Sequence, residues 1–184
     1  YNEQDSIGNV LRDIPKDLVR EIIVCNNNST DNTKAVALEN GATVVDQPLK
    51  GYGNACLKGM DYIKTLSEKP DIIVFLDGDY SDYPEELLKL VGPIIKNNID
   101  FVVGSRVSKL REDGAMTIPQ IFGNWLATSL MSLFFNSKFK DLGPFRAIKY
   151  HKLLALQMED KTYGWTVEMQ LKVLKNNYSY LEIP

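Results

Sequence analysis

The stretch Val-Phe-Leu-Asp-Gly-Asp-Tyr-Ser-Asp, residues 74–82, takes an apolar run directly into two carboxylates that are one residue apart. Side chains at positions i and i+2 of an extended backbone point the same way, so Asp77 and Asp79 can reach one point in space. Oxygen donors of this kind suit a divalent cation, and such a cation most often acts by holding a diphosphate. We therefore expect a strand over 71–76 that ends at a cation site.

Strand-like and helix-like segments alternate around this stretch. Runs typical of strands cover 21–25, 42–45 and 101–104, and helical patterns cover 34–39, about 54–66 and 84–96. Capping residues precede the first helix, Asn40-Gly41 closes it, and a proline stands in the first turn of the third. This rhythm predicts an α/β fold with a mostly parallel sheet flanked by helices, in which ligands bind at the carboxyl ends of the strands.

The pattern changes after Arg106. A polar loop over 107–117 precedes a long apolar segment over 118–135, then a cluster over 141–146 and a helix over 166–175. Neither a linker nor an internal repeat interrupts the chain. We expect residues 1–184 to form a single domain with a nucleotide-binding half over about 1–106 and an acceptor half over about 107–184.

Composition excludes several classes of function. A net charge of −3 leaves no basic surplus for general nucleic-acid binding. Two cysteines, Cys25 and Cys56, without paired spacing predict neither a disulfide framework nor a zinc site, which fits a reducing compartment. The single histidine, His151, argues against a multi-histidine metal site, and we expect it at the surface near a helix start.

The apolar segment 118–135 reads IPQIFGNWLATSLMSLFF and is interrupted by polar residues. A membrane-spanning helix is therefore not expected. Two alternatives stay open, a helix in the protein core and a helix that lies on a membrane surface.

Seven short motifs follow one another along the chain: YNE, NNNSTDNT, KGYGNA, FLDGDYSDYPEEL, VVGSR, DLGPFRAIK and YGWTVEMQ. Their order resembles glycosyltransferase family 2, whose members have the GT-A fold, and within it the branch of dolichol-phosphate mannose synthases and other polyprenyl-phosphate glycosyltransferases. The resemblance implies inverting transfer of a sugar from a GDP- or UDP-sugar with Mg²⁺ or Mn²⁺. It also implies a place in the cytoplasm or at the cytoplasmic face of a membrane, with peripheral membrane contact.

The resemblance assigns a set of residues to the sugar donor: Tyr1, Glu3, Asn26, Asn27, Lys50, Asp77, Gly78 and Asp79. Asp77 and Asp79 are the implied metal ligands, with Asp79 as the principal one. The family usually has an aspartate where Asn26 stands, and an amide both donates and accepts, so contacts with the base could differ here. Glycines beside Lys50 would permit close approach to the donor, and an ordinary loop before a helix is the alternative.

A second set belongs to the acceptor side. The resemblance places Arg106 and Arg146 near donor and acceptor phosphates, with structural ion pairs as the alternative. Glu168 lies on the final helix, and Trp165 would stack on sugar or lipid unless it only packs in the core. The implied catalytic residues are Asp79, Arg106, Arg146 and Glu168.

The sequence lacks an obvious base for a hydroxyl acceptor. Many relatives carry a carboxylate two or three residues before the glutamate of the final helix, where this chain has Thr166 and Trp165. An acceptor that is already an anion needs no base, so we favour a polyprenyl phosphate such as dolichyl or undecaprenyl phosphate. With Glu168 as the base, the alternative is a saccharide hydroxyl in the synthesis of cell-wall or surface polysaccharide.

Two other classes of protein remain as rivals. A haloacid-dehalogenase-like phosphatase also places an Asp-x-Asp triplet after an apolar strand, although normally close to the N-terminus. An inactive module that binds a nucleotide sugar is the non-enzymatic alternative. We also expect the chain to lack the first strand and the C-terminal extension of the GT-A pattern, as part of a longer protein.

Overall fold

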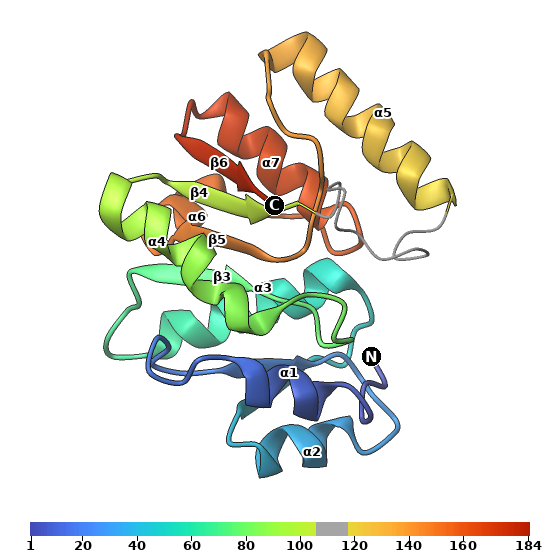
Figure 1. The fold of residues 1–184 in the computed structure, drawn as a ribbon. Helices are drawn as coiled ribbons and strands as arrows, with labels where there is room; N and C mark the ends of the chain where they lie inside the picture. Colours follow the sequence, from blue (N-terminus) through green and yellow to red (C-terminus); the bar gives the residue numbers. More distant parts are fainter. Residues whose placement is uncertain (106–117) are drawn as a thin grey trace. The chain divides into compact units, whose positions relative to one another are not determined.

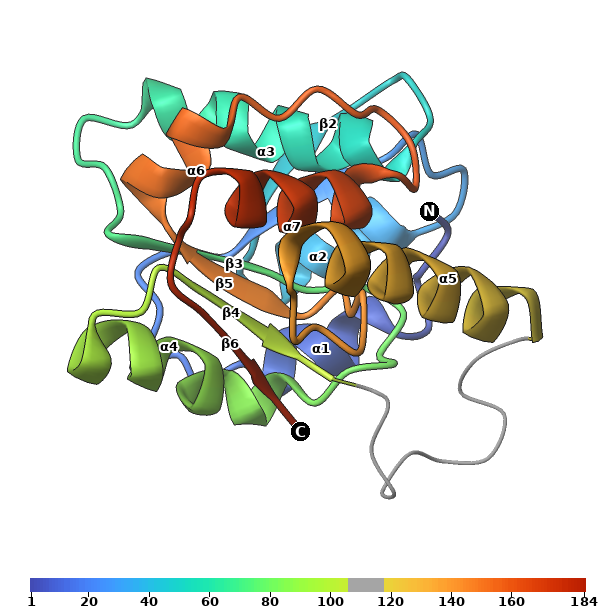
Figure 2. The ribbon, with the colours of Figure 1, turned by 90° about the horizontal axis from the view of Figure 1, so that it is seen from above.

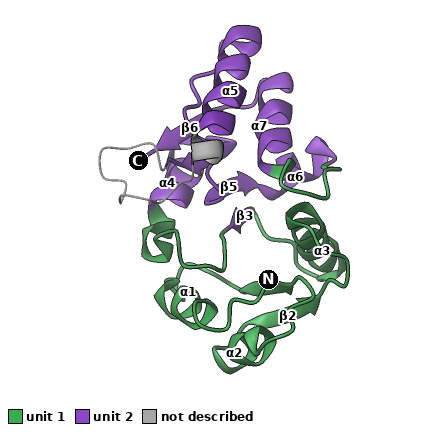
Figure 3. Cartoon of the chain, turned by 90° about the vertical axis from the view of Figure 1, so that its right-hand side faces the viewer, with its two compact units in different colours: residues 1–71, 76–88, 158–165 green, residues 72–75, 89–157, 166–184 purple. Residues whose placement is uncertain are grey.

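The computed structural model describes residues 1–105 and 118–184, and the chain divides into two compact units (Figure 3). Unit 1 comprises residues 1–71, 76–88 and 158–165, and unit 2 comprises residues 72–75, 89–157 and 166–184. Each unit is assembled from segments that are far apart in sequence. The expectation that the chain is one functional domain stays a prediction.

Unit 1 contains a two-stranded parallel sheet and helices that precede and follow its strands (Figure 1). The register of the sheet pairs Asn26 with Asp46. Its elements are α1 (Ile7–Asp13), β1 (Ile23–Asn26), α2 (Thr33–Glu39), β2 (Thr43–Asp46), α3 (Tyr52–Thr65) and the 3₁₀ helix η1 (Pro84–Glu86).

Local chemistry explains how these elements begin and pack. Asp31 Oδ1 accepts a hydrogen bond of 3.0 Å from the backbone N–H of Thr33 at the start of α2, as the capping pattern predicted. Gly59 of α3 leaves room for Cys25 of β1, because a Cβ on Gly59 would lie 2.9 Å from the Cys25 Sγ. Burial raises the pKa of Cys25 to about 11, so this thiol stays neutral and acts in packing.

Unit 2 contains a four-stranded mixed sheet in the order β3-β5-β4-β6 (Figure 2). Strand β5 is antiparallel to β3 and to β4, whereas β6 is parallel to β4. The elements are β3 (Ile72–Phe75), α4 (Leu87–Asn97), β4 (Phe101–Gly104), α5 (Ile118–Phe135), β5 (Arg146–Lys149), α6 (Tyr150–Leu156), α7 (Trp165–Lys175) and β6 (Tyr180–Ile183); α4 and α7 begin within unit 1.

The core of unit 2 is centred on β4 and β5. Phe101, Val102 and Val103 are fully buried, and so are Ala147 and Ile148 opposite them. A strand that is buried on both faces reads as a continuous apolar run, which is why the sequence pattern predicted β4.

The predicted fold class is confirmed, with parallel strand pairs and flanking helices. The predicted strands correspond to β1, β2, β3 and β4, whereas α1, β5 and β6 were not predicted. His151 is exposed in the first turn of α6, as expected. In the part of the chain that the structure describes, no helix has the length and apolar character needed to cross a membrane.

Helix α5 covers the predicted range 118–135, but it is not the core helix that one alternative suggested. Met131 is buried, whereas Leu133 and Phe134 are 75% and 73% exposed. The described residues therefore cover one side of α5 and leave its apolar side open.

Candidate functional site

The N-terminal segment and the loop after β1 are joined by hydrogen bonds within unit 1. The backbone N–H of Asn2 donates to Ser29 Oγ (3.0 Å), and the Asn2 Oδ1 accepts from the N–H of Thr30 (2.9 Å). The N–H of Glu3 donates to Thr33 Oγ1 at 2.7 Å. The predicted donor residues at the N-terminus are thus held against the predicted base-side loop.

The Asp77-Gly78-Asp79 turn is held to the same N-terminal segment. The Ser6 hydroxyl lies 2.8 Å from the carbonyl oxygen of Gly78 and 2.8 Å from Glu3 Oε2, so it bridges the turn and the predicted donor carboxylate. A Cβ on Gly78 would lie 3.8 Å from Glu3 Cγ. Ser6 is a site residue that the sequence motifs did not indicate.

Asp77 is half-buried, and Asp79 is exposed beyond it. Asp79 Oδ1 accepts a 3.0 Å hydrogen bond from the N–H of Ser81, which orients its carboxylate. Tyr80 has a φ of 63°, in the left-handed region, and its hydroxyl donates to Asp13. The turn is therefore fixed on both sides of Asp79.

The donor set of this turn fits a divalent metal that binds together with a diphosphate. The described residues contain no group of three or more His, Cys, Asp or Glu that could hold a metal by itself. Mg²⁺ is usually bound by one or two carboxylates, with water and substrate phosphates as the other ligands. Asp77 and Asp79 are such a pair of carboxylates.

Asn26 lies at the end of β1, where its side chain is buried and used within the protein. Its Nδ2 donates to Asp46 Oδ1 at 2.9 Å, and its Oδ1 accepts from the N–H of Ser29 at 3.3 Å. Hydrogen bonds from Lys34 and Asn26 lower the pKa of Asp46, which keeps this carboxylate ionised. The predicted contact of Asn26 with the base stays a prediction.

Asn27 holds the loop that carries Lys50. Its Nδ2 donates to the carbonyl of Leu49 (2.8 Å), and its Oδ1 accepts from the N–H of Gly51 (2.9 Å). Lys50 Nζ lies 4.1 Å from the centre of the Tyr1 ring. Three of the predicted donor residues, Tyr1, Asn27 and Lys50, are therefore brought together.

The pKa of Tyr1 reflects the same surroundings. A hydrogen bond with the side chain of Thr30, followed by a hydrogen bond and charge attraction from Lys50, lowers the pKa of this phenol. The amine of Lys50 is thus placed where an anionic group at the N-terminal segment would be favoured.

The glycines beside Lys50 have a packing role that the sequence did not indicate. A Cβ on Gly51 would lie 2.2 Å from the carbonyl oxygen of Lys161, and one on Gly53 would lie 2.0 Å from that of Asp160. The N–H of Gly53 donates to the carbonyl of Thr162 at 3.0 Å. The glycines let the 160–162 segment approach, so the start of α3 and this segment form one surface.

Arg146, a predicted acceptor-side residue, lies in unit 2 and is fully buried. Its guanidinium donates to the carbonyls of Leu142 (2.9 Å), Gly143 (3.0 Å) and Thr166 (3.1 Å). Arg146 therefore holds the 142–143 loop to the first turn of α7. Its predicted contact with an anionic partner stays a prediction.

The other predicted acceptor-side residues have different surroundings. Glu168 is mostly buried and pairs with Lys172, one turn further along α7, at 2.8 Å. Trp165 is fully buried, which fits the core-packing alternative. Arg106 and the predicted loop 107–117 lie outside the described residues.

Asp141 is the first residue of the DLGPFRAIK motif, but the sequence assigned it no role in the site. It is fully buried, and its Oδ1 accepts from the N–H of Leu142 at 2.7 Å. Gln170 of α7 donates to the Asp141 carbonyl at 2.9 Å. A buried carboxylate next to a conformationally fixed loop is a feature that sequence spacing alone does not reveal.

Comparison with known proteins yields one family and several relatives. The model of the family "Glycosyl transferase family 2" matches residues 1–155. Protein RfbJ of Shigella flexneri is 37% identical over 107 residues, which covers 58% of this chain and 79% of the relative. A dolichyl-phosphate hexose transferase of Haloferax volcanii is 30% identical over 189 residues, which covers 100% of this chain and 78% of the relative.

Solved structures share the fold. Glucosyl-3-phosphoglycerate synthase from Mycobacterium tuberculosis, solved with Mn²⁺ and UDP-glucose, superposes with a TM-score of 0.75 at 22% identity. The match covers 98% of this chain and 64% of that protein, so this chain spans less than two thirds of its length.

Proposed function

This chain belongs to glycosyltransferase family 2, and we propose that it transfers one sugar from a nucleoside diphosphate sugar to a polyprenyl phosphate. The observation that carries the donor half of this proposal is that the N-terminal segment is bonded to the Asp77-Gly78-Asp79 turn. Ser6 bridges Glu3 to the Gly78 carbonyl, between the two carboxylates that suit a metal-bound diphosphate.

Asp77 and Asp79 would hold Mg²⁺ or Mn²⁺ at the diphosphate of the donor. A metal bound there would offset the negative charge that develops on the leaving nucleoside diphosphate. The Mycobacterium tuberculosis synthase, which has the same fold, was solved with Mn²⁺ and UDP-glucose, and this supports a divalent metal and a UDP-sugar as the first candidates.

The remaining donor residues would act by position and charge. Lys50 places a cation beside Tyr1 and would favour the donor phosphates, while Asn27 keeps the Lys50 loop in place. Holding the reacting groups in a fixed orientation lowers the entropic cost of the transfer. Inversion requires the acceptor oxygen to attack the anomeric carbon opposite the leaving diphosphate.

The choice of acceptor rests on the final helix. Neither Trp165 nor Thr166 offers a carboxylate, and Glu168 is paired with Lys172. A lipid phosphate is already an anion and needs no general base. The Haloferax volcanii relative is named as a dolichyl-phosphate transferase, which supports the same class of acceptor.

A thermal-shift panel tests the donor half. Because ligands that bind only the folded state raise its stability by RT ln(1+[L]/Kd), UDP, GDP and their sugars are compared with and without Mn²⁺ or Mg²⁺. We expect a metal-dependent rise in the melting temperature with one nucleotide, lost in Asp79→Ala. Asp71→Ala is the matched control, because Asp71 is an exposed aspartate just before β3, the strand that leads to the turn with Asp79.

A shift that needs no metal, or that persists in Asp79→Ala, would contradict the proposed donor site. Donor binding without any transfer in the full-length protein would instead indicate a module that only binds nucleotide sugars. Release of phosphate from phosphomonoesters would favour a phosphatase.

A further inference from the structure

Tyr80, the residue after Asp79, has a backbone conformation that tyrosine rarely adopts. Its φ of 63° lies in the left-handed region, where the Cβ of an L-residue crowds the backbone. Among the described non-glycine residues with a positive φ, five are asparagine, one is glutamine and the other is Tyr80. Asparagine accepts this conformation readily, whereas a bulky residue keeps it only where its surroundings hold it there.

A hydrogen bond to α1 holds Tyr80 in this conformation. The Tyr80 hydroxyl donates to Oδ2 of Asp13, the last residue of α1. Tyr80 is 44% exposed, so little packing is available to hold its ring. Helix α1 is a firm support, because Val10 and Leu11 are 4% and 1% exposed in the core of unit 1. The bond to Asp13 therefore fastens a strained residue to a buried helix.

The start of the same helix holds the turn on its other side. Ser6, just before α1, has its hydroxyl 2.8 Å from the carbonyl oxygen of Gly78. A Cβ on Gly78 would lie 3.3 Å from Ile7 Cδ1, so helix and turn are in close contact. The two ends of α1 thus hold the two residues that flank Asp79.

The conformation of Tyr80 is linked to the orientation of the Asp79 carboxylate. With Tyr80 in the left-handed region, the N–H of Ser81 lies 3.0 Å from Asp79 Oδ1. A change of φ at residue 80 swings the next peptide group, and this N–H with it, away from the carboxylate. The carboxylate would then lose the bond that orients it, and ordering it when a ligand binds would cost entropy.

We propose that Asp13 and Tyr80 are positioning residues for the metal-binding turn. Their hydrogen bond keeps Tyr80 left-handed, and Asp79 is therefore already oriented when the divalent cation arrives with the nucleotide. A ligand that binds only one state of a turn binds more weakly in proportion to the protein that occupies other states. The inference rests on the proposed donor site and adds two residues to which the sequence assigned no role.

The test measures nucleotide binding to the full-length protein by isothermal titration calorimetry, with and without Mn²⁺. The nucleotide is UDP or GDP, whichever passes the thermal-shift panel. Tyr80→Phe removes the hydroxyl and keeps the ring, and Asp13→Ala removes the acceptor. Asp13→Asn removes the charge but keeps an oxygen that accepts a hydrogen bond.

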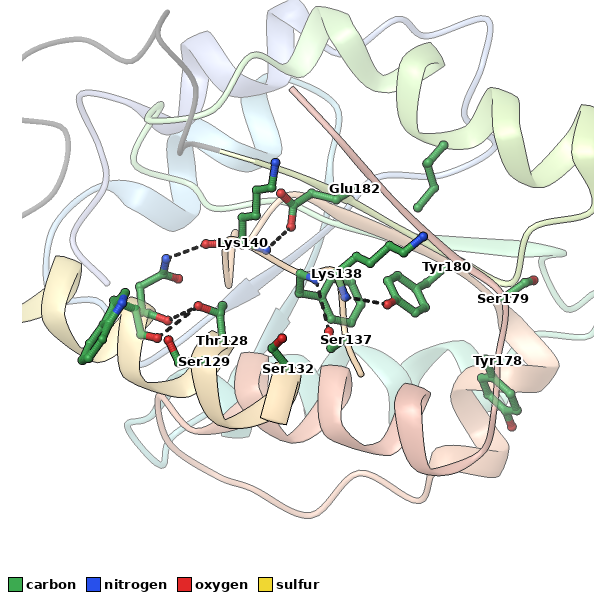
Figure 4. Close-up of a pocket in the computed structure, with 14 residues that line it drawn as sticks. Thr128, Ser129, Ser132, Ser137, Lys138, Lys140, Tyr178, Ser179, Tyr180 and Glu182 are labelled. Carbon is green, nitrogen blue, oxygen red and sulfur yellow. Dashed lines mark hydrogen bonds between the residues drawn. The ribbon is translucent and has the colours of Figure 1, made fainter. Parts of the chain in front are cut away.

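Two other tyrosine hydroxyls provide matched controls. Tyr62, on α3, donates to Glu21 Oε1 at 2.9 Å, ahead of β1. Tyr180 accepts from the N–H of Lys138 at 2.9 Å beside a hollow of unit 2, where Figure 4 shows the pair. A general effect of losing a tyrosine hydroxyl would appear in Tyr62→Phe and Tyr180→Phe as well.

We expect Tyr80→Phe and Asp13→Ala to raise the Kd of the nucleotide with Mn²⁺ about two- to tenfold and to leave the Kd without metal unchanged. The double variant should bind no more weakly than either single variant, because both remove the same bond. Asp13→Asn should recover most of the affinity that Asp13→Ala loses. The two control variants should match the wild type.

Tyr80→Gly separates the backbone conformation from the hydroxyl. Glycine enters the left-handed region without a steric cost. We therefore expect Tyr80→Gly to bind the nucleotide with Mn²⁺ more tightly than Tyr80→Phe does, although it lacks both the ring and the hydroxyl. Circular dichroism of each variant checks that it is folded.

Unchanged metal-dependent affinity in Tyr80→Phe would overturn the proposal, and so would an equal loss in Tyr62→Phe. Weaker binding by Tyr80→Gly than by Tyr80→Phe would do the same, as would an equal loss of affinity with and without metal. If the wild type shows no metal-dependent binding, the proposed donor site fails, and this inference with it. Wild-type binding therefore tells the two failures apart.

Discussion

At the scale of single residues, the amide of Asn26 connects the donor loop to the sheet of unit 1. It donates to Asp46 on the neighbouring strand and accepts from Ser29 in the loop. An aspartate at this position, as the family resemblance implies for relatives, would face the Asp46 carboxylate across the register. The departure from the family pattern therefore has a local structural reason, whatever its effect on the base.

Asn26→Asp tests this pairing. When two carboxylates face each other, the pKa of one of them is raised. The folded variant then binds a proton more tightly than the unfolded chain does. Its stability is therefore lost as the pH rises through that raised pKa. We expect the variant to be less stable than the wild type by about 1 kcal/mol at pH 7 and the difference to shrink below about pH 4. Urea unfolding at pH 7 and below about pH 4 measures this difference in stability. Asn26→Ala is the uncharged control.

Asp100 gives a second residue-scale prediction with the opposite dependence on pH. Burial by itself would raise its pKa, but hydrogen bonds from Lys149 and Ser179 lower it below the ordinary value of 3.8. A lowered pKa means that stability is present above the ordinary value and is lost as the pH falls through the folded value.

Asp100→Asn should therefore lower the free energy of unfolding by on the order of 2 kcal/mol at pH 7, because hydrogen bonds to a buried charge are lost. The same substitution should flatten the acid limb of the stability curve below about pH 4. Urea titrations across this range compare the two proteins, and an unchanged acid limb would show that Asp100 does not produce it.

At the scale of elements, the sequence predicted those whose pattern is local. Strand β4 is a continuous apolar run, and α2 has a capping aspartate before it and Gly41, with a φ of 81°, after it. Strand β5 was missed because it begins with Arg146, whose buried guanidinium bonds backbone carbonyls that are distant in sequence. Helix α1 was missed because its seven residues are too few to show a clear helical period.

In the candidate site, too, features with a local sequence pattern could be predicted, and features that depend on distant contacts could not. Its carboxylates and loops could be located from the sequence, because each lies at or just after the end of a strand that the local pattern predicted, β1 for Asn26 and Asn27 and β3 for Asp77 and Asp79. The bridging role of Ser6 and the contact of Gly53 with the 160–162 segment could not, since each joins parts of the chain that are far apart in sequence.

Gly53→Ala tests the contact between α3 and the 160–162 segment. The added methyl group would lie 2.0 Å from the carbonyl oxygen of Asp160, a backbone atom that cannot move alone. We expect destabilisation of about 3 kcal/mol in urea unfolding. Gly92→Ala is the control, because a Cβ there meets no atom within 4 Å and alanine favours the α4 helix; equal effects of the two substitutions would refute the close contact.

At the scale of the whole molecule, the predicted site residues are divided between the two units, with the donor residues and Trp165 in unit 1. The donor residues and the Asp77–Asp79 turn lie in unit 1, whereas Arg146 and Glu168 lie in unit 2. The proposed reaction would use groups from both units, so loss of activity alone would not identify which half has failed. Donor binding and transfer must therefore be measured on the same variants.

The most direct measurement of the central claim is transfer of radiolabelled sugar from the nucleotide that passes the thermal-shift panel to polyprenyl phosphate. It uses the full-length protein with Mn²⁺ or Mg²⁺ and compares wild type, Asp79→Ala and Glu168→Gln, with Asp71→Ala as the control. We predict that Asp79→Ala lowers transfer by on the order of 10²–10³-fold, whereas Glu168→Gln only weakens it. Equal and complete loss in both variants, with transfer to a saccharide but not to the lipid phosphate, would contradict the account.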